Sequence, residues 1–260
     1  MKMEQITNHI YMMRDLEGSV ASNAFLIIGN EKAILIDSMN GNELIKPIIK
    51  QVTDLPVNLI HTHGHCDHIG GDGEFGEAYI DPKDMEVAKI HWEEVQQERI
   101  KQGKEREEEI KWKPFLPGAC IDLGGYILET YEVPGHTPGG LCFLNREERI
   151  LITGDAVTEH IWMQLWESQP LEILIQSLQA LDSIRDEFDT IYNGHAEGAV
   201  AVSVIDKLIC GVREILDGNT KMDHTYTCFD ELFKAHPLHS DNPDHLIVYA
   251  ESEDKKYKMG

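Results

Sequence analysis

The sequence predicts an α/β protein, because apolar runs typical of buried strands alternate with helical patterns along the first part of the chain. Residues 33–37 and 57–60 are such apolar runs, and between them residues 41–52 place apolar side chains at helical spacing. A strand, a helix and a second strand in this order are typical of a sheet covered by helices. The 260 residues suffice for a substantial core and contain no long linker, so we expect residues 1–260 to form one domain.

Further elements are expected before and after this unit. Short apolar runs bounded by turn residues predict strands. These strands are expected at residues 10–13, 24–28, 126–133, 141–144, 149–153, 190–192 and 245–250. Apolar residues at helical spacing predict helices over residues 171–181 and 199–216. The polar tail after the last strand is expected to fray.

Residues 82–113 differ from the rest of the chain in being rich in Glu, Lys, Arg and Gln. Large apolar side chains occur among these charges, which predicts one or two partly exposed amphipathic helices that end before Pro114. We interpret the segment as a charged helical insertion in the domain. It could be a solvated surface element, or it could cover the functional site as a lid or a dimerisation arm.

The composition limits the possible partners and compartment. A formal net charge of −23 argues against a nucleic-acid partner, since binding of phosphate backbones requires clustered Lys and Arg. The N-terminus lacks the apolar stretch of a secretory signal, and no apolar run approaches the roughly 20 residues that span a bilayer. The five cysteines form no CxxC pair, which fits reduced thiols. We therefore expect a cytoplasmic protein with no membrane partner.

A dense cluster of metal-ligand side chains directly follows the strand expected at residues 57–60. It consists of His63, His65, Asp67 and His68, on what we expect to be a loop before Gly70. The alternating His63 and His65 can converge on one metal ion, while the adjacent Asp67 and His68 can turn toward a second. Imidazoles combined with a carboxylate suit zinc, and also iron or manganese.

Three later residues also place a metal-binding side chain directly after an expected strand, one residue at each strand. His136, Asp155 and His195 each follow an expected strand and stand beside a glycine, where the backbone can turn sharply. A histidine-rich loop could bind metal adventitiously, but three further ligand types at strand ends favour a built site.

Taken together, these residues resemble those of the metallo-β-lactamase superfamily. The family signature HxHxDH matches residues 63–68 without a gap, and the later single ligands match in order and with similar spacing. The resemblance covers about residues 10–216 and implies a four-layer αββα sandwich with the site at one edge. Asp37 corresponds to a structural Asp of the family on an early strand.

The resemblance also implies a role for each ligand. The first metal ion would be held by His63, His65 and His136. The second would be held by Asp67, His68 and His195. Asp155 would bridge the two ions, which the resemblance implies are Zn²⁺, with iron or manganese as alternatives.

Residue 155 also indicates the subgroup. True β-lactamases of this family usually carry Cys at this position, so Asp155 indicates the Asp-bridged dinuclear group that includes glyoxalase II-like and lactonase-like enzymes. The chain differs from both of these kinds of enzyme in its sequence. It lacks the Cys-Gly-Arg stretch of the glutathione-dependent members, and no Tyr stands between Asp155 and Gln169 as in acyl-homoserine lactonases.

The expected function is metal-dependent hydrolysis of a small ester, thioester or lactone. A metal-bridging hydroxide would attack the carbonyl carbon, and Asp67 could relay the proton to the leaving group. The expected partner is a small-molecule substrate, and a homodimer is possible. The alternatives are a phosphodiesterase or RNA-processing nuclease, an iron-dependent redox enzyme on the same ligands, and a metal-binding module without activity.

The segment from residue 160 to residue 166 is the expected wall of the substrate pocket. It carries His160, Trp162, Met163 and Trp166 directly after the bridging Asp155. These side chains could instead pack in the core or at a dimer interface. Outside the motifs, His61 is expected to pack or to support a ligand, and His239 and His245 are weaker candidates for the same supporting role.

Overall fold

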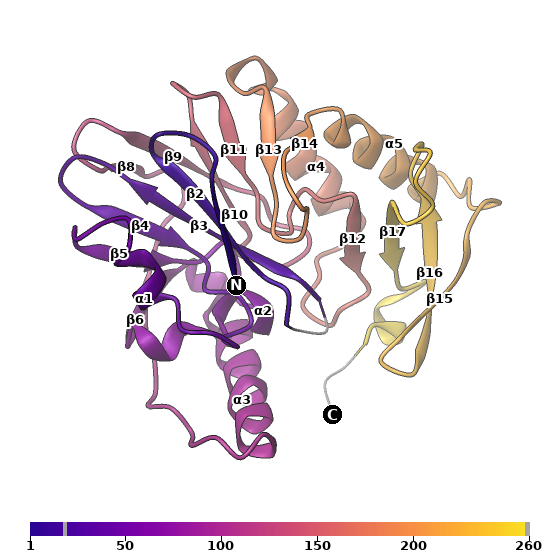
Figure 1. Cartoon of the computed structure of the whole chain (residues 1–260). Helices are drawn as coiled ribbons and strands as arrows, with labels where there is room; N and C mark the ends of the chain where they lie inside the picture. The colour runs from indigo at the N-terminus through magenta and orange to yellow at the C-terminus, as the bar shows by residue number, and fades with distance from the viewer. Residues whose placement is uncertain (18–19, 258–260) are drawn as a thin grey trace.

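The computed structural model of the protein describes residues 1–17 and 20–257, and two large sheets form its centre (Figure 1). The first has seven strands, which lie side by side in chain order. They are β1 (Lys2–Gln5), β2 (Ile10–Asp15), β3 (Ser22–Ile28), β4 (Ala33–Ile36), β5 (Val57–Ile60), β6 (Glu77–Ile80) and β7 (Lys111–Pro114). Strands β4 to β7 run parallel, as expected where helices connect successive strands.

The second sheet has six strands and mixes both strand directions. In spatial order they are β14 (Val200–Ala201), β13 (Thr190–Tyr192), β11 (Ile150–Ile152), β10 (Leu141–Asn145), β9 (Ile127–Glu132) and β8 (Cys120–Asp122). β11 and β13 are parallel, and their carboxyl ends therefore point to the same edge of the sheet.

Alternation along the strands builds the core between the two sheets. In β3, Phe25 and Ile27 pack in a cluster with Phe143 of the second sheet. The intervening Leu26 belongs to a separate cluster on the outer face of the first sheet. Each sheet thus buries both faces, which explains why its strands appear in the sequence as continuous apolar runs.

Helices cover the two outer faces. α1 (Lys46–Ile49) packs on the first sheet through Ile49. On the second sheet α4 (Leu171–Asp182) and α5 (Val204–Leu216) contribute Leu174, Leu178, Ile205 and Leu208 to one cluster. This order of layers confirms the predicted αββα sandwich. The helix predicted over residues 41–52 is shorter than expected, since only Lys46–Ile49 is helical and turns surround it.

A third sheet extends the sandwich beside α5. It consists of β12 (His160–Met163), β17 (Leu246–Tyr249), β16 (Glu231–Pro237) and β15 (His224–Cys228). Only β17 was predicted. The tail that was expected to fray instead returns to the molecule, where the backbone N–H of Tyr257 donates to the carbonyl of Gln164 at 2.8 Å. The prediction for residues 251–257 is therefore wrong, while residues 258–260 lie outside the described part.

The charged segment over residues 82–113 is only partly helical. α3 (Met85–Lys101) confirms the predicted helix, but Lys111–Pro114 forms β7 and pairs with β6, so helix up to Pro114 is wrong. Trp92 and Ile110 pack with Ile69 of α2 (Cys66–Ile69), which anchors the segment to the ligand-bearing stretch. None of the helices that the structure describes has the length and apolar character required to cross a bilayer.

Candidate metal centre

The structure brings all seven predicted ligand side chains to one edge of the sandwich. His63 and His65 follow β5, while Asp67 and His68 lie on the one-turn helix α2 rather than on the expected loop. The remaining three also follow strands: His136 comes after β9, Asp155 after β11 and His195 after β13. The meeting point is set by topology, because strands of both sheets end at this edge.

Three histidines form the first group. Nδ1 of His65 lies 3.1 Å from Nε2 of His63 and 3.0 Å from Nε2 of His136. All three side chains are buried. Their inward nitrogens lie close enough together to be held by one ion.

Asp67, His68 and His195 form the second group, and Asp155 lies between the two groups. Oδ2 of Asp155 is 2.8 Å from Nε2 of His195 and 3.7 Å from Nε2 of His136. Its Oδ1 is 3.4 Å from Nε2 of His68. One carboxylate therefore faces ligands of both groups, as a bridging residue must.

The outward nitrogen of each histidine has a hydrogen-bond acceptor as its partner. Nδ1 of His68 donates to Asp37 at 2.8 Å, and Nδ1 of His136 and His195 donate to the carbonyls of Trp162 and Ala21 at 2.7 and 2.8 Å. Carbonyl and carboxylate oxygens only accept, so these bonds leave the Nε2 lone pairs of the three imidazoles directed at the centre.

The inward-facing groups fit a cation. Nε2 of His65 donates to Glu167, so Nδ1 of His65 carries a lone pair. This Nδ1 lies 3.0 Å from Nε2 of His136, which also carries a lone pair. Two lone pairs at this distance repel unless a cation lies between them. Nε2 of His68 and Oδ1 of Asp155 are also buried without a hydrogen-bond partner among the described residues. Gly194 leaves space beside them, since a Cβ there would lie 2.7 Å from Cε1 of His68.

The electrostatics differ between the two groups. Burial, together with the neighbouring histidines, lowers the pKa of His136 to about 4 and that of His63 well below its usual value. Burial also acts to lower the pKa of His195, but the charge of Asp155 raises it to about 9. His63 and His136 are therefore neutral near pH 7 and ready to coordinate, whereas an ion at the second group would displace protons.

Asp37 supports the centre from the end of β4. Its carboxylate accepts hydrogen bonds from Nδ1 of His68 and, at 2.7 Å each, from the backbone N–H and the hydroxyl of Thr62. Asp37 has a φ of +63°, a conformation that Asp and Asn adopt more readily than most residues. The position thus favours a short side chain with carboxylate acceptors, consistent with the structural role that the resemblance implies.

Glu167 and His91 were missed in the sequence. Glu167 accepts from Nε2 of His65 and is buried, and Nε2 of His91 lies 3.7 Å from its Oε1. Burial acts to lower the pKa of His91, but contacts with Cys66, Glu167 and Glu94 raise it to about 11. Neither residue stands in a motif, so no signal in the sequence points to them. Conversely, His61 bonds Asp72 at 3.0 Å beside Asp37, while His239 and His245 bond Glu214 and Ser240 away from the centre.

Glu167→Gln is expected to weaken metal binding by about 10- to 100-fold, the usual cost of losing a hydrogen-bond partner of a metal-binding histidine. The amide nitrogen of the variant can donate a hydrogen bond to Nε2 of His65. This favours the tautomer of His65 with its proton on Nδ1, and that proton blocks the lone pair that would bind the metal ion. Metal affinity is measured by competition with a chromogenic chelator. Glu172→Gln, at an exposed position of α4, is the matched control and should bind as the wild type does. Equal affinities of the two variants would contradict the role of Glu167.

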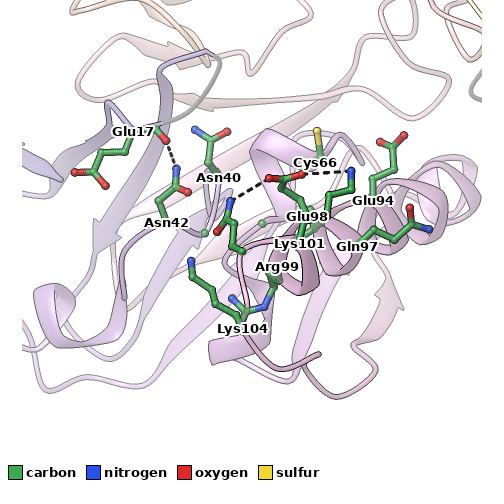
Figure 2. A pocket seen from close by; sticks show the side chains of 14 residues that line it. Glu17, Asn40, Asn42, Cys66, Glu94, Gln97, Glu98, Arg99, Lys101 and Lys104 are labelled. Carbon is green, nitrogen blue, oxygen red and sulfur yellow. Dashed lines mark hydrogen bonds and ion pairs between the residues drawn. The ribbon is translucent and has the colours of Figure 1, made fainter.

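Two of the cavities formed by the described residues are large and lie on either side of Cys66. One is a polar cleft of about 540 Å³ between α3 and the chain around residue 40, and its side chains are shown in Figure 2. The other has a volume of about 390 Å³ and is lined by five of the candidate ligands, namely His65, Asp67, His136, Asp155 and His195. Cys66 and Glu94 line both cavities and separate them. α3 thus forms a wall shared by both cavities, and its action as a lid or a dimerisation arm stays a prediction.

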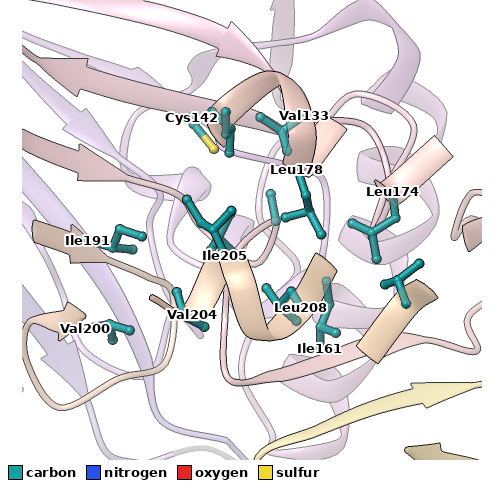
Figure 3. Close-up of a cluster of buried hydrophobic side chains, with 14 of the residues drawn as sticks. Val133, Cys142, Ile161, Leu174, Leu178, Ile191, Val200, Val204, Ile205 and Leu208 are labelled. Carbon is teal, nitrogen blue, oxygen red and sulfur yellow. The ribbon is translucent and has the colours of Figure 1, made fainter. Parts of the chain in front are cut away.

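The expected pocket wall is a strand rather than a loop. β12 places His160 and Trp162 on the cavity side, and Trp166 lines the same cavity beyond the strand. Met163 was wrongly placed in this wall: it is buried in the cluster that also contains Ile161, shown in Figure 3. The reason is strand alternation, which turns residues 161 and 163 away from the cavity.

Comparisons with known proteins agree with this geometry. The chain is 26% identical over 144 residues to the probable metallo-hydrolase YqgX of Bacillus subtilis, a match that spans 54% of this chain and 68% of that protein. It is 29% identical over 150 residues to the hydroxyacylglutathione hydrolase GloC of Haemophilus influenzae, which spans 52% and 66%. Several other curated relatives are matched over less than two thirds of their length, for example 38% for a thioesterase of Pseudocercospora fijiensis.

Among solved structures, a metallo-beta-lactamase family protein from Thermus thermophilus superimposes with a TM-score of 0.65 over 86% of each chain, at 20% identity. This likeness concerns the fold. The family model of the metallo-beta-lactamase superfamily matches residues 18–207, which include all seven candidate ligands. The chain therefore belongs to the metallo-beta-lactamase superfamily and is a metal-dependent hydrolase of that family.

Proposed function

We propose that the protein is a two-metal hydrolase that cleaves a small ester, thioester or lactone. The observation that carries the proposal is the position of Asp155, whose two carboxylate oxygens face nitrogen ligands of both groups. A first ion would be held by His63, His65 and His136, and a second by Asp67, His68 and His195, with Asp155 shared. When bound, two such ions supply a water of lowered pKa and polarise the substrate carbonyl.

The protein contributes orientation and proton transfer. The hydrogen bonds to Asp37, Trp162, Ala21 and Glu167 fix the imidazole rings before substrate arrives. Asp67 is the candidate proton carrier, because its side chain is 22% exposed and lines the cavity, with Oδ2 3.6 Å from Nε2 of His195. It can accept a proton at this position and deliver it to the leaving group.

A thioester is the favoured bond among these substrates. Relatives named hydroxyacylglutathione hydrolase occur in Haemophilus influenzae, Bdellovibrio bacteriovorus and Synechococcus, at 27–29% identity. A further relative in Pseudocercospora fijiensis is named an ACP thioesterase. Phosphodiester cleavage is disfavoured by the net charge of −23, which repels phosphate backbones. The cytoplasmic location and the homodimer stay predictions.

Hydrolysis assays on protein stripped by a chelator and reloaded with Zn²⁺, Fe²⁺ or Mn²⁺ test the proposal. The panel contains an acetyl thioester, a lactone, an aryl ester and bis(p-nitrophenyl) phosphate. Turnover of the thioester that disappears on stripping and returns on reloading is the expected result, and the metal giving the highest rate identifies the preferred ion. Turnover of the phosphodiester without any cleavage of carbonyl esters would overturn the proposal.

A further inference from the structure

The cavity of about 390 Å³ that five candidate ligands line has a wall that is mostly aromatic and apolar. Besides Trp162 and Trp166, it includes Leu165, Tyr226, Phe229 and Tyr257. Tyr226 and Phe229 come from the β15–β16 hairpin, and Tyr257 comes from the segment after β17. The third sheet and the final segment thus complete a pocket that opens onto Asp155 and His195.

Phe229 has a backbone conformation that aromatic residues seldom adopt. It forms with Asp230 the two-residue turn between β15 and β16, and both residues have positive φ, +51° and +60°. Such turns favour Asn, Asp and Gly, so a bulky aromatic residue here costs stability. The ring packs on the cavity side, 4.4 Å from Tyr257 and 5.6 Å from Trp162 between ring centroids, and the residue stays 51% exposed.

The basic side chains that line the cavity are imidazoles. No Lys or Arg occurs among the described residues that line it. The ring nitrogens of His91 are flanked by carboxylates, with Nδ1 3.1 Å from Glu94 and Nε2 3.7 Å from Glu167. In the polar cleft, Arg99 and Lys101 pair with Glu107 and Glu98 at 3.0 and 3.6 Å (Figure 2 shows the second pair). A carboxylate placed in the aromatic pocket would therefore lose its hydration without gaining a cation.

Two neutral polar atoms in this wall lack a partner. Nε1 of Trp166 and Nε2 of His160 are buried without a hydrogen-bond partner among the described residues. The indole N–H can only donate. Because both atoms are closed off from the cavity space, they add no polar contact for a bound group, and the wall presents its apolar surface.

We infer that the enzyme is selective for substrates with an uncharged aromatic or bulky apolar acyl group, held in the pocket formed by Trp162, Phe229 and Tyr257. The inference rests on the proposed function and specifies the substrate class of the same site. It separates this chain from an enzyme that recognises an anionic acyl group. Phe229 is the specificity-determining residue, because its ring contacts both Trp162 and Tyr257 in the pocket wall and its positive φ is one that aromatic residues rarely adopt.

Three thioesters with the same neutral thiol, N-acetylcysteamine, test the inference. We expect kcat/KM for the phenylacetyl thioester to exceed that for the succinyl thioester by at least about 100-fold, because the succinyl carboxylate cannot be paired in the pocket. The acetyl thioester serves as the reference that is too small to fill the pocket. Equal rates for the phenylacetyl and succinyl compounds would overturn the inference, whereas no turnover of any of the three would count against the proposed function instead.

Phe229→Asn separates binding from folding. Asn suits the turn, so the melting temperature should not fall, while the ratio of kcat/KM for phenylacetyl over acetyl should fall about tenfold, the scale of one aromatic contact. Leu232→Ala is the matched control, since Leu232 lies in the same hairpin, is 71% exposed and does not line the cavity. An unchanged ratio in Phe229→Asn would contradict the role of Phe229.

Binding without turnover gives an independent measurement on the intact wild-type protein. The amide analogues of the phenylacetyl and succinyl thioesters are titrated while the tryptophan fluorescence of the protein is followed, to which Trp162 and Trp166 of the cavity wall contribute two of four indoles. Saturable quenching by the neutral aromatic amide alone is expected. Quenching by the succinyl amide at equal or lower concentration would overturn the inference, even if no thioester is hydrolysed.

Discussion

Asp155→Ala is expected to abolish hydrolysis and to reduce the bound metal from two ions to one or none per chain. The substitution removes the carboxylate that faces both ligand groups, and it leaves His68 and His195 without their shared partner. The loss of activity should exceed the roughly 100-fold typical of removing a hydrogen-bond partner of a ligand, because the ligand itself is lost. Metal content is measured by mass spectrometry and activity on the thioester of highest turnover.

The control for this variant is Asp54→Ala, because the side chain of Asp54 is 97% exposed and its ion-pair partner is Lys50, which is not a candidate ligand. It should retain wild-type metal content and activity. Circular dichroism of both variants establishes that the fold is kept. If Asp155→Ala retained two ions and full turnover, Asp155 would not be the bridging ligand, and the proposed two-metal arrangement would fail.

Asp37→Asn is expected to keep the fold but to lose the ion of the second group. Asn tolerates the positive φ of this position, so the backbone need not change. Asp37 accepts from Nδ1 of His68 and from the Thr62 hydroxyl through the same oxygen, Oδ2. An amide nitrogen there would donate to Nδ1 and shift the proton of His68 to Nε2, which would remove the inward lone pair.

Asp37→Ala provides the contrast. It leaves the buried His68 and Thr62 donors without an acceptor, and we expect a loss of about 3–5 kcal/mol in the free energy of unfolding. Unfolding in urea measures this stability, and titration with Zn²⁺ measures the number of sites. If Asp37→Asn bound two ions with wild-type affinity, the tautomer of His68 would not depend on this carboxylate.

Most of the α/β pattern could be predicted from the sequence because local periodicity reports burial directly. The runs at residues 24–28, 33–37 and 57–60 form strands that are largely buried, as their continuous apolar character indicates. The strands β15 and β16 were missed because they are mostly exposed or mixed in character. β7 was hidden among charges, since only its pairing with β6 makes Lys111–Pro114 a strand.

The seven candidate ligands could be located in the sequence because each combines a metal-binding side chain with a strand end and most stand near a glycine. Their convergence is implied by the resemblance, and in the structure their side chains lie together at one edge of the sandwich. Met163 shows the limit of this reasoning, because a one-residue alternation decides between cavity and core, and β12 was not recognised as a strand.

The amino-acid sequence by itself determined the α/β class, the ligand types and their order along the chain, since these depend on neighbouring residues. Only the tertiary structure decided what surrounds them. Glu167 reaches His65 across 102 positions, and Phe229 meets Trp162 and Tyr257 because β12 pairs with β17 and β16 pairs with β17. Such contacts leave no local pattern, because the free energy that forms them comes from packing between distant segments rather than from adjacent residues.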